Sequence, residues 1–116
     1  MSTYRLSNLN AELHAGDVGT EILVTIYDIT EEDGELVQAV LDLTGITVTM
    51  LLCGSSGTVE RDTELVGLAS AGTVKAITQA GDLVSGPLTI RCKLVRDSDQ
   101  ATWHTAGVVT QVWPVC

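Results

Sequence analysis

Apolar and polar residues alternate along most of this chain, with the two-residue period that is typical of β-strands. The clearest example is the segment 20–28 (TEILVTIYD), in which Ile22, Val24 and Ile26 share one face. The segment 88–96 (LTIRCKLVR) alternates just as regularly. No stretch of useful length has the period of a helix, so the pattern predicts strands throughout.

Turn residues divide the chain into short strands. Asp33 and Gly34 form a strong hairpin signal, and Leu36–Val40 (LVQAV) is predicted to return along the first strand. The other predicted strands are 46–53, 58–62, 73–79 and 107–113. About seven to eight short strands separated by turns predict one all-β domain, an antiparallel β-sandwich.

Residues 1–19 are less regular than the rest. Tyr4, Leu6, Leu9 and Leu13 are separated by two, three and four positions, which leaves a short helix, a strand or an arm open. We therefore divide the chain into an N-terminal arm or edge segment, 1–19, and a sandwich, 20–116. An arm of this kind packs on its own domain or holds a neighbouring subunit.

Composition and charge limit the partners. The chain has 116 residues without any Phe, and 15 acidic against 6 basic residues give a net charge of −9. Such a charge repels phosphate backbones and anionic lipids, so we expect neither nucleic acid nor membrane as a partner. It serves solubility or complements a basic protein surface. The start of the chain carries no targeting signal, which predicts synthesis in the cytosol.

Residues for catalysis or cofactor binding are sparse. His14 and His104 are the only histidines, and the turn 54–57 (GSSG) is not a nucleophile elbow, so we expect no enzyme and no cofactor. The cysteines have no zinc spacing. The acidic cluster 31–35, and Asp97 with Asp99, carry oxygens suited to calcium, although such side chains on turns are usually only solvated.

Trp103, in the segment ATWHTAG, stands outside the strand pattern. It either caps one end of the sandwich or anchors an interface, a role in which Trp is enriched. The candidate contact residues of the chain are Tyr4, Leu6, Leu9, Trp103 and Trp113.

Several segments of the chain share one pattern of turns and strands. They are 42–52 (DLTGITVTMLL), 57–59 (GTV), 71–74 (AGTV) and 81–86 (GDLVSG) before a long alternating strand. This pattern of turns and strands is similar to that of the N-terminal immunoglobulin-like domain of baseplate upper proteins of tailed bacteriophages. Similar domains occur in head-fibre bases and small virion proteins of these phages. The likeness covers about 20–112. The chain departs from the pattern in its aliphatic strand positions, its acidic insertion at 31–35 and its lack of a following coiled coil and head.

The resemblance implies an immunoglobulin-like sandwich and no catalytic residues. It implies a structural virion protein that docks on the capsid as a decoration, cement or head-fibre-base protein, assembled in the cytoplasm of a bacterial host. Its partners would be the major capsid protein or other virion subunits, in a homo-oligomer or symmetric array. A tail or baseplate adaptor of the same fold is the close alternative, and a carbohydrate- or calcium-binding module is a rival of another class.

The cysteines Cys53, Cys92 and Cys116 leave two interpretations open. In a reducing compartment they are apolar core residues. The alternative is a bridge between Cys53 and Cys92, which lie on two predicted core strands, where immunoglobulin-type sandwiches place theirs. Cys116 takes no part in this bridge.

Overall fold

The computed structural model describes residues 3–8, 13–54 and 57–114. In these residues it contains two packed sheets and one short 3-10 helix, η1, at Ala69–Ala71. The strands are β1 Thr3–Asn8, β2 Leu13–His14, β3 Glu21–Glu32, β4 Glu35–Val40, β5 Ile46–Gly54, β6 Gly57–Asp62, β7 Glu64–Leu65, β8 Thr73–Ile77, β9 Gly86–Arg96, β10 Thr102–His104 and β11 Val108–Trp113.

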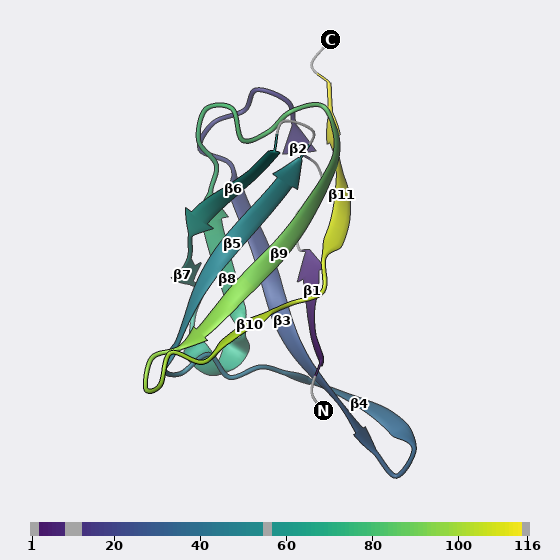
Figure 1. Cartoon of the computed structure of the whole chain (residues 1–116). Helices are drawn as coiled ribbons and strands as arrows, with labels where there is room; N and C mark the ends of the chain where they lie inside the picture. The colour runs from purple at the N-terminus through teal and green to yellow at the C-terminus, as the bar shows by residue number, and fades with distance from the viewer. Residues whose placement is uncertain (1–2, 9–12, 55–56, 115–116) are drawn as a thin grey trace.

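The order of the strands in the two sheets resembles that of an immunoglobulin-like sandwich. One sheet has the order β1-β3-β8-β7, with β4 added to β3, and the other has the order β2-β11-β9-β5-β6, with β10 added to β9. In that fold, β1-β3-β8-β7 corresponds to the A-B-E-D order and β5-β9-β11 to the C-F-G order, while β2, β4, β6 and β10 are additional strands. Figure 1 shows β5 and β9 of one sheet lying in front of β3 and β8 of the other. The predicted β-sandwich is confirmed.

Two details differ from the sequence prediction. The described residues hold more strands than predicted, because β2, β7 and β10 are pieces of two or three residues, too short to show alternation. In addition, β2 pairs with β11 in parallel, whereas every other pair is antiparallel. The predicted antiparallel pairing therefore holds for the described strands except at this one edge, where the sheet is mixed.

The described part of the N-terminal segment belongs to both sheets. β1 pairs with β3 at the edge of one sheet, and β2 pairs with β11 at the edge of the other. Leu13 is buried in the core, at 1% exposure. Of the alternatives that the sequence left open, an edge segment of strand describes residues 3–8 and 13–14.

The core between the sheets is aliphatic. Its alternating inward positions agree with the predicted faces, because Ile22, Val24 and Ile26 are each 0% exposed. The other buried apolar residues are Leu13, Leu43, Val48, Met50, Leu52, Val74, Ala76, Leu83, Leu88, Ile90, Cys92, Leu94 and Val112. None of these described core residues is aromatic, and most of them are Leu, Ile or Val, so branched aliphatic side chains fill most of the space between the sheets.

Candidate docking surface

The feature that departs most from a compact sandwich is the hairpin of β3 and β4. Its strands pair from Tyr27 with Val40 to Glu32 with Glu35, and Asp33 and Gly34 close the turn. Both turn residues have positive φ, 51° and 80°, the conformation that a two-residue turn with the twist of the strands requires. Figure 1 shows the hairpin projecting from one end of the sandwich, and the molecule measures 50 × 31 × 25 Å.

Apolar side chains on this hairpin are uncovered. Every residue of β4 is exposed, and Leu36 is 77% exposed. On β3 the exposure rises along the strand, from the fully buried Ile26 to the half-buried Tyr27 and Ile29. A two-stranded hairpin without a covering layer is only marginally stable in water. Exposed apolar residues on such an element are typical of a surface that another protein covers.

The tip of the hairpin is acidic. Glu31, Glu32 and Glu35 flank the turn residue Asp33, and all four are exposed. The hairpin from Ile29 to Val40 contains no Lys or Arg. Apolar residues along the strands and carboxylates at the turn together suit a partner with an apolar contact surface and a basic rim.

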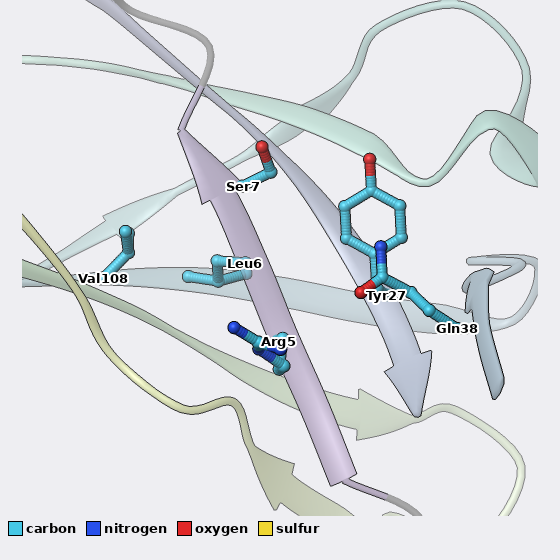
Figure 2. Close-up of a pocket in the computed structure, with 6 residues that line it drawn as sticks. All are labelled: Arg5, Leu6, Ser7, Tyr27, Gln38 and Val108. Carbon is cyan, nitrogen blue, oxygen red and sulfur yellow. The ribbon is translucent and has the colours of Figure 1, made fainter. Parts of the chain in front are cut away.

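A shallow hollow of about 380 Å³ lies where the hairpin leaves the sandwich. It is lined by Arg5, Leu6, Ser7, Tyr27, Gln38 and Val108. Figure 2 shows Leu6 and Val108 toward one side of the hollow and Tyr27 and Gln38 at the other. Arg5 and Tyr27 are direct partners in the β1–β3 ladder. The positive charge of Arg5 therefore lies beside the apolar surface at the base of the hairpin.

The predicted contact residues lie away from the acidic tip of the hairpin. Tyr4 and Trp103 contact each other, with ring centroids 6.2 Å apart and planes at 59°, and both pack against the core. The guanidinium carbon of Arg96 lies 5.0 Å from the centroid of the Trp103 ring. Trp103 is thus half-buried in its own domain, which favours its interpretation as a cap of the sandwich.

The remaining candidates have different surroundings. Leu6 is half-buried and packs against the core, while Trp113, at the end of β11, is 51% exposed. Leu9 lies outside the described residues. The sequence predicted the acidic turn and the return strand of this hairpin, but it did not identify β4 as a contact surface. The available signal was LVQAV next to a strong turn, but the same pattern also suits a buried strand.

The cysteine bridge is contradicted. Cys53 and Cys92 are free cysteines, and they lie on opposite faces of their sheet. Cys92 is buried opposite Met50, and burial raises the pKa of its thiol to about 12. A thiol with such a pKa is inert at neutral pH. Cys116 lies outside the described residues.

None of the described ion pairs was predicted from the sequence, and the most buried of them joins Arg61 to Asp82. Arg61 donates two hydrogen bonds to Asp82, Nε to Oδ2 at 2.7 Å and Nη2 to Oδ1 at 2.6 Å, and the Gln79 amide also donates to Oδ2, at 2.8 Å. The Asp82 side chain is only 2% exposed. The bonds from Arg61 hold the pKa of Asp82 below its usual value, against the effect of burial. The pair joins β6 to the loop before β9, and its role is structural.

The chemical candidates are scattered. His14, on β2, lies next to Trp113, whereas His104, on β10, lies next to Lys93 toward the other end of the sheet. Asp99 accepts two hydrogen bonds from Arg96, and Asp97 accepts one from Thr47. Within the described ranges, no three His, Cys, Asp or Glu side chains form a group that could hold a metal ion.

None of the helices that the structure describes is long and apolar enough to cross a membrane. Compared with protein-family models and with curated proteins, the sequence matches none.

Proposed function

We propose that this protein is a non-enzymatic docking module of a larger protein assembly, and that the β3–β4 hairpin is its contact element. The observation that carries the proposal is β4, a strand whose six residues are all exposed although four of them are apolar. Burial of such side chains under a partner contributes roughly 25 cal/mol per Å² of apolar surface. The acidic tip would then meet basic residues at the rim of the partner surface.

The assembly that we propose is the virion of a tailed bacteriophage. The support is the resemblance of the strand and turn pattern to immunoglobulin-like domains of phage particles, together with the immunoglobulin-like order of the strands. In that setting the protein would sit on the capsid as a decoration, cement or head-fibre-base protein, with the major capsid protein as its partner. A tail or baseplate position of the same module is the alternative.

Purified particles test this proposal. The tagged protein is produced in the cells in which the particles assemble, the particles are banded by density, and its copy number is measured against the major capsid protein by mass spectrometry. We expect a fixed ratio, high for a decoration protein and low for a tail protein. Absence of the protein from intact particles would refute the virion assignment.

A pair of matched variants tests the hairpin. Leu36→Asp places a charge on the exposed hairpin, while Val109→Asp makes the same change on β11, where Val109 is 67% exposed. We expect Leu36→Asp to lower the particle-bound amount at least tenfold, which corresponds to about 1.4 kcal/mol. Val109→Asp should bind as the unmodified protein does. Equal binding by both variants would show that the hairpin is not the contact element.

A further inference from the structure

The open edge of β4 has backbone groups ready for another strand. Within the described residues, β4 pairs with β3 alone. Leu41 donates its amide to the carbonyl of Ile26 at 2.9 Å, and bonded positions alternate along an antiparallel ladder. Val37 and Ala39 therefore face β3, whereas Leu36, Gln38 and Val40 direct their N–H and C=O groups to the open edge.

Natural sheets usually protect such an edge. Lys side chains, Pro, bulges or a covering loop are the common devices. Residues 36–40 (LVQAV) contain neither Lys nor Pro, and the β3–β4 pairing runs without a bulge from Tyr27 to Glu32. The edge is thus unprotected over the residues that carry the exposed apolar side chains.

The side chains of β4 match a second copy of the same strand. Around Gln38, the apolar residues Val37 and Ala39 lie one position away, and Leu36 and Val40 lie two positions away. In an antiparallel pair with Gln38 opposite Gln38, Leu36 would therefore lie opposite Val40, and Val37 opposite Ala39. Opposed side chains share a face of the sheet in this register, as antiparallel pairing requires.

The hydrogen bonds favour the same register. With Gln38 on the two-fold axis, Leu36, Gln38 and Val40 all meet residues whose backbone groups also point outward, giving about six bonds between the copies. Moving the centre to Val37 would place Leu36 opposite Gln38 and Glu35 opposite Ala39, with about four bonds. The side-chain match and the larger number of bonds thus both favour the register centred on Gln38.

From these observations we infer that two copies of this protein associate through their β4 strands, edge to edge, in an antiparallel pair centred on Gln38. The inference rests on the proposed docking function and deepens it, because the pairing uses the edge of the hairpin and leaves its faces for the particle. A two-fold axis makes the contact self-complementary.

The charges specify how the pair responds to salt. Antiparallel pairing places the two acidic turns at opposite ends of the joined sheet, where each lies near Asp42 of the other copy. The net charge of −9 on each copy also opposes association. Because salt screens like charges, the pair should become tighter as ionic strength rises. A contact with a basic partner would weaken under the same change.

Sedimentation of the full chain tests the pair. The contact is smaller than a standard interface of about 800 Å² per partner, so we expect a dimer with a dissociation constant on the order of 10–100 μM, tightened by salt. Gln38→Pro removes the outward N–H without touching a bond to β3, and should weaken the dimer roughly thirtyfold, since the symmetric contact loses two bonds. Gln38→Thr keeps the N–H and is the matched control.

Cross-linking tests the register. Cα atoms of a hydrogen-bonded pair lie about 5.5 Å apart, within disulfide range, so Gln38→Cys should form a disulfide-linked dimer in a chain with Cys53→Ser and Cys116→Ser. Glu35→Cys in the same chain should not cross-link, because the two copies of residue 35 would lie roughly 20 Å apart.

Three outcomes would overturn the inference. They are a monomer at every concentration and salt, a dimer that Gln38→Pro leaves intact, and cross-linking that is equal at positions 35 and 38. The particle experiment separates this failure from that of the proposed function. A monomeric Gln38→Pro protein that still binds particles would show docking without need of the pair. If Leu36→Asp then fails to bind particles while Gln38→Pro binds them, the loss bears on the docking function itself and not on the pair.

Discussion

Strand β3 runs through two regions, the sandwich and the β3–β4 hairpin, which are stabilised by different contacts. In the sandwich, its residues Ile22, Val24 and Ile26 are covered by the opposite sheet and are 0% exposed. In the hairpin, β3 continues beside β4. Every residue of β4 is exposed. Both regions have an unbroken antiparallel ladder. The comparison teaches that the ladder and the turn set the shape of the hairpin, whereas coverage by a second layer decides how much stability an apolar residue contributes.

The free energies of apolar burial and of hydrogen bonding explain why the sandwich and the hairpin differ in stability. Full burial of an aliphatic side chain contributes about 1.5–3 kcal/mol, while an intramolecular hydrogen bond contributes a net 0.5–1.5 kcal/mol. The sandwich has both contributions. The hairpin has mainly the second, so a partner that covers it would supply the stabilisation that its own domain does not.

The largest expected effect is on the free energy of unfolding, when one apolar side chain is truncated in each region. Ile90→Ala, at a fully buried position of β9, removes contacts with both sheets and should lower the free energy of unfolding by about 3–4 kcal/mol. Leu36→Ala, on the hairpin, should change it by less than about 0.5 kcal/mol. Urea denaturation followed by circular dichroism measures both. Similar losses would mean that the hairpin is part of the core.

A smaller loss in the free energy of unfolding is expected at the Arg61–Asp82 pair. This pair stabilises the sandwich by hydrogen bonds and charge and not by apolar burial. Asp82→Asn leaves Arg61 without its carboxylate and should cost roughly 2–3 kcal/mol. Because the pKa of Asp82 is lower in the folded protein than in the unfolded chain, its stabilisation is complete above about pH 4 and is lost as pH falls through the folded pKa.

Denaturation at a series of pH values checks this prediction. The difference in unfolding free energy between the unmodified protein and Asp82→Asn should be constant near neutral pH and shrink in acid. Thr47→Val, which removes a hydroxyl bound to the exposed Asp97, is a control for the loss of a surface hydrogen bond. A difference that grows in acid would contradict the assigned direction of the pKa shift.

The smallest effect tests whether the hairpin opens by itself. Gly34→Ala forces a side chain onto a residue with φ of 80° and should destabilise the turn by about 1 kcal/mol. We expect faster hydrogen exchange at the amides of Val37 and Ala39 and nearly unchanged global stability. Asp33→Asn, which tolerates the same turn, is the control. An equal loss of global stability would show that hairpin and sandwich unfold as one unit.

Much of the fold follows from local features of the sequence. The alternation in 20–28 and 88–96 predicted the long strands, and Asp33-Gly34 predicted the hairpin turn, because backbone conformation depends on neighbouring residues. The contacts of Tyr4 with Trp103 and of Arg61 with Asp82 could not be predicted in this way, since each joins segments far apart in the chain. The bridge between Cys53 and Cys92 failed for a related reason, because it depended on the faces that the register assigns.

By itself, the sequence determined that the chain forms strands, where the main turns lie, and that its inward faces are aliphatic. Only the tertiary structure decided which of the alternating strands are covered. Segments 22–26 and 36–40 both present apolar residues on strands, yet one lies in the core and the other in solvent. The physical reason is that a two-residue period shows that the faces of a strand differ, while burial depends on what the distant parts of the chain place over them.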